Sequence, residues 1–438
     1  MRSSSSSERG VPEAAWQWDG EDGGHAGAAA GDVVGGGGGD GPRVSRRALL
    51  VGAGVLAAGG AAWAFGRSRE DRPAPKPTAP APVAVSGPTP VWTYRGPEAM
   101  TPERLTSHPN RPVYVTSAGL QLLDPATGAP TRLLRLAPTE RQYGDDPTVA
   151  RVVISGDRVF TTSQGHIDGR DLGDPSADLT VALPEAVTDD VVLAGCDGTT
   201  LYGTAYAKPT QDDRIPGHKA FAVRIADSTL LWSSPADLGE KLLAPSAGPT
   251  GVIASARTSE GRTELVVRDA ATGRQRWTAA GSENLRWCAV GQRAVHVPDG
   301  SGGLRALDLA TGAALWTLPP RGENWRAMPP LVAGAAVFLP RDNGLVTAHS
   351  EAGPDAHWSL RLPFLLDARS HPMLVNGVLY VPGPAGGGVC AVDAATGRLL
   401  WTFRDSGPGK DVWSLAADGT CLYAGHDDVL HALPLATV

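Results

Sequence analysis

The sequence predicts an all-β fold built from a repeated unit of about 43 residues. The first observation is a phrase that occurs three times, as Asp269 to Trp277, Asp308 to Trp316 and Asp393 to Trp401. In each copy Thr-Gly fills the third and fourth places after the aspartate. The second observation is the spacing of 45, 39, 42 and 43 residues between successive tryptophans, which are Trp232, Trp277, Trp316, Trp358 and Trp401. This period, with several short apolar runs in each unit, predicts a β-propeller with one four-stranded blade per repeat.

The chain before the repeats falls into three segments. Residues 1–42 are a low-complexity leader rich in serine and glycine, which we expect to be disordered because it buries too little apolar surface. Residues 43–66 place Arg46-Arg47 ahead of an uncharged run over 48–66, which resembles a twin-arginine export signal. Residues 67–90 are a proline-rich linker, and the propeller is expected over 91–438.

The uncharged run over 48–66 leaves two alternatives open. Ala62-Trp-Ala64 is a candidate cleavage site for a secreted protein, whereas 19 apolar and small residues are also long enough to remain as a membrane anchor. Both alternatives place the propeller outside the cytoplasm, secreted or anchored to the cell membrane.

One unit shows how a blade is expected to form. Short apolar runs occupy 371–375, 378–381, 388–393 and 398–403. Asn376-Gly377 lies between the first two, and Asn-Gly between apolar runs predicts a tight hairpin because both turn residues need positive φ. The Asp-x-x-Thr-Gly stretch predicts the last hairpin of the unit, with the aspartate accepting turn N–H groups and the glycine in the left-handed region.

The repeated phrase therefore supplies structural residues. The predicted turn residues are Asp269, Gly273, Asp308, Gly312, Asp393 and Gly397. A large indole on the outer strand is expected to pack between neighbouring blades, with its N–H reaching a backbone carbonyl next door. The predicted docking residues are Trp92, Trp232, Trp277, Trp316, Trp358 and Trp401.

The number of blades follows from the ends of the array. Seven units end at Arg132, near Val181 and at the five spaced tryptophans. Three further strands are expected over 412–433, and the segment 91–94 would supply their missing fourth strand. Joining the two ends closes an eighth blade and removes exposed edges. We therefore predict eight blades, with seven as the alternative because residues 137–230 are poorly patterned.

The pattern Ala-x-Asp-x-x-Thr-Gly-x-x-x-Trp, present at Ala306 to Trp316 and Ala391 to Trp401, resembles the pyrroloquinoline-quinone (PQQ)-type propeller repeat. A looser copy with Val267 in place of alanine runs to Trp277. The family includes quinoprotein dehydrogenases, the BamB-type propeller of outer-membrane assembly, and propellers attached to bacterial Ser/Thr kinases. The exported, linker-mounted layout is similar to the last group without its kinase domain.

Catalytic chemistry is not expected. The resemblance implies that a dehydrogenase would carry adjacent cysteines beside the quinone, but Cys196, Cys288, Cys390 and Cys421 are isolated. Metalloprotease, C-x-x-C, nucleophile-elbow and phosphate-loop motifs are missing from the sequence. We expect no enzyme activity, cofactor or metal, and we interpret His426 and His431 as surface or turn residues. The net charge of −7 argues against nucleic-acid binding.

The binding candidates lie at the starts of predicted inner strands, which line the central channel. They are Arg286, Trp287, Trp325, Arg326, Arg369, His371 and Trp413. Aromatic and guanidinium groups converging there could hold an anionic or sugar-like ligand or a peptide, although each tryptophan could instead pack between inner strands.

We expect a monomeric, non-enzymatic binding or scaffold module at the cell envelope that recognises a protein, peptide or glycan. The alternatives are a ligand sensor that works with a Ser/Thr kinase and, less favoured, a PQQ-dependent dehydrogenase.

Overall fold

The computed structural model describes most of the second compact unit of the chain, which spans residues 79–438. Within the described residues the chain forms 32 β-strands and one short 3-10 helix, η1 (Pro175–Ala177). The described ranges are 86–100, 105–108, 111–116, 119–135, 152–155, 157–163, 166–183, 189–206, 217–236, 240–244, 250–259, 262–281, 285–299, 301–320, 325–407 and 409–438.

The first four blades are four-stranded antiparallel sheets in which strands adjacent in sequence pair with each other. Blade 1 contains β2 (Leu105–His108), β3 (Arg111–Thr116), β4 (Gly119–Leu123) and β5 (Pro130–Arg135). Blade 2 contains β6 (Val152–Ser155), β7 (Arg158–Ser163), β8 (His166–Asp171) and β9 (Leu179–Ala182). Blade 3 contains β10 (Asp189–Cys196), β11 (Thr200–Tyr206), β12 (His218–Arg224) and β13 (Leu230–Ala236). Blade 4 contains β14 (Lys241–Ala244), β15 (Val252–Ser259), β16 (Arg262–Asp269) and β17 (Gln275–Ala280).

The next three blades repeat this arrangement, and the eighth differs in the origin of its outer strand. Blade 5 contains β18 (Ala289–Val290), β19 (Ala294–Pro298), β20 (Leu304–Asp308) and β21 (Ala314–Leu318). Blade 6 contains β22 (Leu331–Ala333), β23 (Ala336–Pro340), β24 (Leu345–Ser350) and β25 (Gly353–Arg361). Blade 7 contains β26 (Met373–Val375), β27 (Val378–Pro382), β28 (Val389–Asp393) and β29 (Leu399–Phe403). Blade 8 contains β30 (Ser414–Ala417), β31 (Cys421–His426), β32 (Val429–Pro434) and β1 (Trp92–Arg95).

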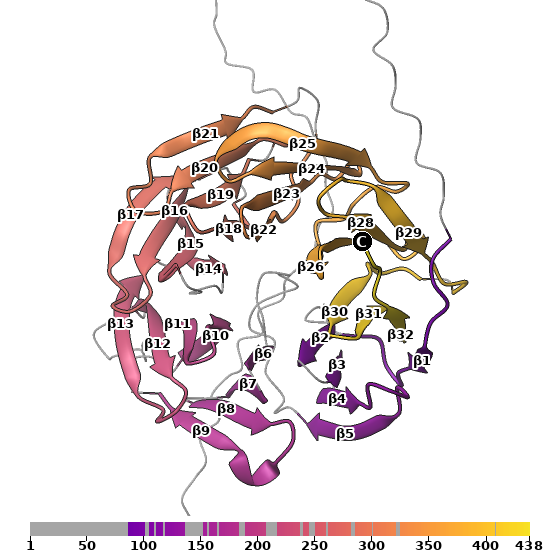
Figure 1. Ribbon diagram of the computed structural model, residues 1–438. Helices are drawn as coiled ribbons and strands as arrows, with labels where there is room; N and C mark the ends of the chain where they lie inside the picture. Colours follow the sequence, from indigo (N-terminus) through magenta and orange to yellow (C-terminus); the bar gives the residue numbers. More distant parts are fainter. Residues whose placement is uncertain are drawn as a thin grey trace, which may run out of the picture. The chain divides into compact units, whose positions relative to one another are not determined.

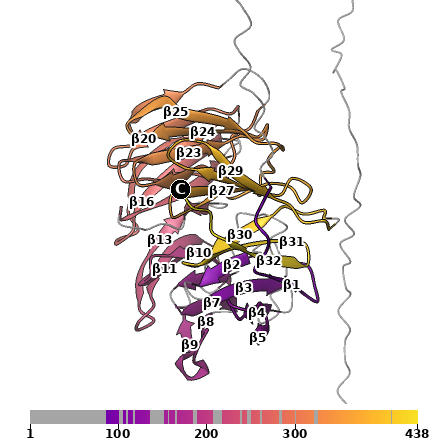
Figure 2. The same cartoon turned by 45° about the vertical axis from the view of Figure 1, so that its right-hand side comes forward.

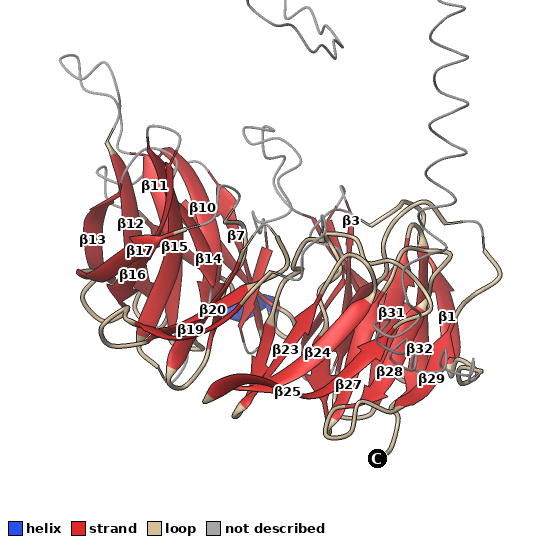
Figure 3. Ribbon diagram, turned by 90° about the horizontal axis from the view of Figure 1, so that it is seen from above, coloured by secondary structure: helices blue, strands red, loops and turns tan. Residues whose placement is uncertain are grey.

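The eight sheets are arranged around a ring, which confirms the predicted all-β, eight-bladed propeller (Figure 1). The first strand of each blade lies nearest the centre, and the fourth lies on the rim. Viewed from above, the ring consists almost entirely of strands and loops (Figure 3). The alternative of seven blades is wrong because residues 152–206 and 217–236 supply two complete sheets despite their weak sequence pattern.

The ring closes through β1, as predicted. This strand comes from the N-terminal side of the propeller and pairs antiparallel with β32, from Trp92 opposite Ala432 to Arg95 opposite Val429 (Figure 2). Closure by strands from both ends of the propeller removes the open edges that a linear array of blades would leave.

Tryptophans on the outer strands join neighbouring blades. Each indole Nε1 donates to a backbone carbonyl in the next blade at 2.8–3.0 Å, in the pairs Trp92–Pro125, Trp232–Ala270, Trp277–Leu309, Trp316–Glu351 and Trp358–Ala394. Trp401 is also buried, and its ring centre lies 5.8 Å from the ring centre of Tyr380. In blade 1, where arginine replaces the tryptophan, Arg132 Nη1 donates to the Asp171 carbonyl of blade 2 at 3.2 Å. The arginine side chain therefore donates a hydrogen bond across the boundary between blades 1 and 2, where no tryptophan is present.

The aspartate of each repeated phrase organises its turn. Oδ1 of Asp269, of Asp308 and of Asp393 accepts the backbone N–H groups two and three residues later. The glycines that follow, Gly273, Gly312 and Gly397, have φ of +69°, +74° and +73°. These are left-handed conformations that a side chain disfavours.

The predicted leader, signal or anchor, and most of the linker lie outside the described residues. Among the residues that are described, no helix is long and apolar enough to cross a membrane.

Candidate functional site

Seven residues predicted as binding candidates lie in loops that lead into the inner strands β18, β22, β26 and β30. Because the strands of every blade are antiparallel, these loops lie at the same end of the strands as the turns between the second and third strands. We call this side of the ring the loop face. The repeated Asp-x-x-Thr-Gly turns lie at the opposite end of the strands.

The loop between β25 and β26 is held firmly on the loop face. Leu362 N donates to Gly344 O and Leu366 N donates to Asp342 O, both at 2.8 Å. Gly344 has φ of +80°, and a Cβ there would lie 2.2 Å from the Phe364 carbonyl oxygen. The Phe364 ring in turn lies against Gly383 and Gly387 of blade 7. The loop is therefore fixed on turns of two blades.

We group four residues on this loop, at its start and on the segment bonded to the same turn of blade 6, and call them the Trp325 cluster: Trp325, Arg326, Arg361 and Leu365. The Arg361 guanidinium lies 5.7 Å from the centre of the Trp325 ring, a cation–π distance. Arg361 Nη1 also donates to the Asn343 carbonyl at 2.9 Å. Arg326 and Arg361 are exposed, and Leu365 is 68% exposed.

The Trp325 cluster is assembled on a single turn of blade 6. Asp342 N donates to Arg326 O at 3.0 Å, while Asp342 O holds the 362–366 loop through Leu366 N. Sequence reasoning found Trp325 and Arg326 but missed Arg361 and Leu365. Neither residue directly precedes an inner strand. That Leu365 is exposed could be recognised only from the structure of its loop.

The remaining candidates have different environments. Arg286 is exposed and Trp287 is half-buried in the loop before β18. His371, in the loop that precedes β26, is exposed, whereas Arg369 is half-buried and held by two ion pairs. Arg369 Nη1 lies 2.7 Å from Asp411 Oδ1, and Arg369 Nε lies 2.9 Å from Asp367 Oδ1. The hydrogen bond and charge of Asp367, with Asp411, raise the pKa of Arg369 despite the opposing effect of burial.

Trp413 is a packing residue, which corrects its assignment as a channel-lining side chain. It is fully buried, and its Nε1 donates to the Ala385 carbonyl at 3.0 Å. Its ring lies 4.3 Å from that of His426 and 5.8 Å from that of Phe403. Trp413 therefore packs inside the fold, which is the alternative that the sequence left open for these tryptophans.

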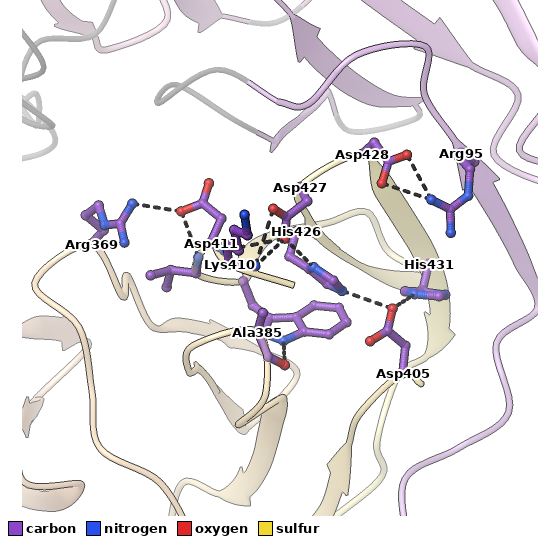
Figure 4. Close-up of polar contacts among 12 residues, drawn as sticks. Arg95, Arg369, Ala385, Asp405, Lys410, Asp411, His426, Asp427, Asp428 and His431 are labelled. Atoms are coloured by element: carbon purple, nitrogen blue, oxygen red, sulfur yellow. Dashed lines mark hydrogen bonds and ion pairs between the residues drawn. The ribbon is translucent and has the colours of Figure 1, made fainter. Parts of the chain in front are cut away.

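A polar network around two buried histidines lies beside Trp413, and we call it the closure network: Thr93, Asp405, His426, Asp427 and His431. Figure 4 shows the last four of these residues. His426 Nδ1 lies 2.9 Å from Asp427 Oδ2, and His426 Nε2 lies 2.9 Å from Asp405 Oδ2. His431 Nε2 lies 3.4 Å from the same Asp405 Oδ2, and His431 Nδ1 lies 2.9 Å from Thr93 Oγ1 of β1.

The interpretation of His426 and His431 as surface or turn residues is wrong, because they are only 2% and 6% exposed. His426 ends the strand Cys421–His426 and His431 lies within Val429–Pro434, and both strands are almost continuously apolar and buried on both faces. Their place in these apolar runs was the signal that could have put them inside. Burial lowers the pKa of His431, and the hydrogen bond and charge of Asp405 only partly oppose this shift. Burial alone would raise the pKa of Asp427, but hydrogen bonds from His426 and from the Asp411 and Lys410 backbone lower it overall.

Metal and thiol chemistry find little support in these side chains. Within the described ranges, no three His, Cys, Asp or Glu side chains are grouped to hold a metal ion. All four cysteines are free. Burial raises the pKa of Cys288 to about 12 and that of Cys390 to about 11, so neither thiol readily forms the nucleophilic thiolate.

Comparisons with known proteins agree with the propeller fold. Residues 219–323 and 300–433 match the family model described as outer membrane protein assembly factor BamB. No curated protein matches the sequence.

Three solved structures are similar. The computationally designed Ika8 protein has 15% identity and a TM-score of 0.59, covering 79% of this chain and 99% of its own. Sqt1 of Saccharomyces cerevisiae has 13% identity and a TM-score of 0.57, covering 80% and 100%. BamB from Moraxella catarrhalis has 17% identity and a TM-score of 0.45, covering 65% and 84%. The first two show the shared fold alone. With its repeated sequence pattern and its eight blades, this chain is a β-propeller, and its residues 219–433 are similar to the BamB family model.

Proposed function

We propose that the propeller is a non-enzymatic scaffold that binds a segment of another protein on its loop face. The match to a family described as an assembly factor supports a binding role over catalysis. Fold alone does not assign function, so the proposal depends on a particular surface.

The Trp325 cluster is the observation that carries the proposal. Tryptophan and arginine are enriched among the residues that dominate protein–protein binding energy, and an exposed leucine supplies apolar contact area beside them. The backbone hydrogen bonds of Leu362 and Leu366 hold this surface in place before a partner arrives. A preorganised surface loses less conformational entropy on binding, which favours affinity.

Action at the cell envelope is part of the proposal. It depends on the twin-arginine-like residues 43–66 and the proline-rich linker 67–90, which would place the propeller outside the cytoplasm as a secreted or anchored module. An envelope protein is the favoured partner, and an envelope peptide or glycan would meet the same face.

Site-specific photocrosslinking in the producing cells tests the binding surface. A photoreactive amino acid at Leu365 should capture a discrete protein, whereas the same group at Leu315 should not. Leu315 is 44% exposed but lies on the rim strand β21, away from the loop face. Capture at Leu365 should weaken when Arg326→Glu is added to the same chain. Equal capture at both positions, or none at Leu365, would contradict the proposal.

The non-enzymatic assignment has its own assay. The purified full-length chain, supplied with PQQ and Ca²⁺, should not reduce a redox dye with alcohols or sugars as substrates. Sustained turnover above that of a heat-inactivated sample would show a dehydrogenase instead.

A further inference from the structure

The closure network contains a polar side-chain link between β1 and the interior of blade 8, beside the apolar packing of Trp92 against Tyr423. β1 is joined to this blade by its backbone pairing with β32 and comes from the opposite end of the propeller. Thr93 Oγ1 contacts the buried His431, while Arg95 forms an ion pair with Asp428 at 2.8 Å that is largely exposed. Exposed ion pairs contribute little to stability, so Thr93 and His431 form the better protected contact.

The two histidines of the closure network have different hydrogen-bonding neighbours. Both nitrogens of His426 face carboxylate oxygens at 2.9 Å, from Asp427 and Asp405. His431 has one carboxylate and one hydroxyl as neighbours. A neutral His431 satisfies both by donating through Nε2 to Asp405 and accepting the Thr93 hydroxyl proton at Nδ1.

A proton added to His431 disturbs this arrangement. Nδ1 becomes a donor, so the hydrogen bond to the Thr93 hydroxyl has to reverse its direction. The larger cost is desolvation of the new charge, because His431 is only 6% exposed and Asp405 compensates this cost only in part.

The surrounding charges do not cancel this effect. Arg95 on β1 and His426 on β31 both disfavour a positive charge on His431, and Asp405 favours it. Asp427 is already bonded to His426 and to the backbone of Lys410 and Asp411, and Asp428 is paired with Arg95 (Figure 4). Consistent with this balance, burial lowers the pKa of His431 below its ordinary 6.5.

We propose that the closure network is an acid-sensitive latch, in which proton uptake by His431 loosens β1 and thereby opens the seam of the ring. When β1 is released, His431 is more solvated and takes up a proton more readily than in the closed ring. Mild acid therefore shifts the population toward the open seam.

Hydrogen–deuterium exchange on the full chain tests the latch through peptides that cover 91–96. Rates are converted to protection factors, which removes the intrinsic effect of pH on exchange. A single proton taken up on opening changes the open population by at most about tenfold per pH unit, and we expect β1 protection to fall at least about twofold from about pH 7.5 to about pH 5.5. Protection of β15 in blade 4 should change less.

Matched variants separate the latch from general acid sensitivity. His431→Gln retains a donor and an acceptor but does not titrate, so β1 protection should lose its pH dependence. His357→Gln, at an exposed position on β25, should respond like the parent chain. The latch is overturned if β1 protection is unchanged by acid in the parent chain or if His431→Gln retains the full response. If His431→Gln fails to fold, Thr93→Val serves as the second variant. It should lower the exchange protection of β1 at both pH values. Protection equal to that of the parent chain would also reject the latch.

Discussion

Gly397 of blade 7 lies directly against the indole of Trp358 in blade 6. A Cβ placed on Gly397 would lie 2.6 Å from Trp358 Cδ2, well inside van der Waals contact. The same relationship joins Gly273 to Trp232 and Gly312 to Trp277. The repeated phrase thus serves two blades at once, because its glycine covers the tryptophan of the preceding blade while its own tryptophan extends to the following one.

Replacing Gly397 by alanine should therefore cost more than its backbone conformation alone. A side chain at positive φ costs about 1–2 kcal/mol, and overpacking against the indole adds about 1–3 kcal/mol. Gly334→Ala is the matched control, because Gly334 has φ of +59° with open space around it. Urea unfolding of both variants measures the difference. Equal losses of stability would show that the glycine is needed only for its φ.

Trp316 should be a stability residue without a direct role in binding. It is buried, donates to Glu351 O at 2.9 Å and lies 5.6 Å from the His296 ring. Trp316→Ala should lower the free energy of unfolding by about 3–5 kcal/mol through the cavity that it leaves. The adjacent Leu315→Ala, at an exposed position, should change stability by less than about 0.5 kcal/mol.

Thermal or urea unfolding, together with photocrosslinking at Leu365, separates these roles of Trp316. Unchanged stability with loss of capture would assign the indole to binding.

The fold was predictable because the repeated phrase marks the same turn and rim strand in successive blades. Blade count was harder, since Arg132 and Val181 replace the marker tryptophan and only three-dimensional pairing reveals their strands. The closing strand was nevertheless inferable, because three strands at one end lacked a fourth and 91–94 stood alone at the other.

The binding face was predictable only in part. Positions before inner strands identified Trp325 and Arg326, but the same rule also selected the fully buried Trp413. Loop sequence does not reveal which way a side chain turns. The closure network was missed because closure of the ring brings Thr93 to His431 from the other end of the propeller, while Asp405 reaches His431 from the neighbouring blade 7.

A second long-range feature that sequence alone could not identify is the buried ion pair between Glu240 and Arg268. Arg268 Nε and Nη2 lie 3.0 and 2.9 Å from the two Glu240 carboxylate oxygens, and the side chains are 5% and 0% exposed for arginine and glutamate. Arg268→Met should cost about 3–5 kcal/mol, because it leaves a buried carboxylate without its cation.

The ion-pair prediction is measured by a double-mutant cycle in urea. Glu240→Leu combined with Arg268→Met should recover part of the loss, since no unpaired charge remains. Arg224 and Asp227 form an exposed pair at 2.8 Å and serve as the control, with an expected coupling much smaller than that of the buried pair. A double variant no more stable than Arg268→Met would show that packing, not the unpaired charge, causes the loss.

Acid should also weaken the ring at the boundary between blades 5 and 6. His296 is fully buried, its Nε2 lies 3.5 Å from Glu351 Oε1, and its Nδ1 has no hydrogen-bond partner among the described residues. Burial lowers the pKa of His296 below 6.5, although Glu351 opposes the shift. The unfolded chain therefore binds this proton at higher pH than the folded chain, so stability is fully present above about pH 6.5 and declines as pH falls below it.

The free energy of unfolding, measured in urea from about pH 7.5 to about pH 5, should accordingly decrease with acid. His296→Gln should flatten part of this decrease without restoring β1 protection, because it lies at a different blade boundary from His431. His357→Gln should leave the decrease unchanged, since that side chain is exposed in the folded ring. If His296→Gln unfolds with the parent pH dependence, the proton responsible binds elsewhere.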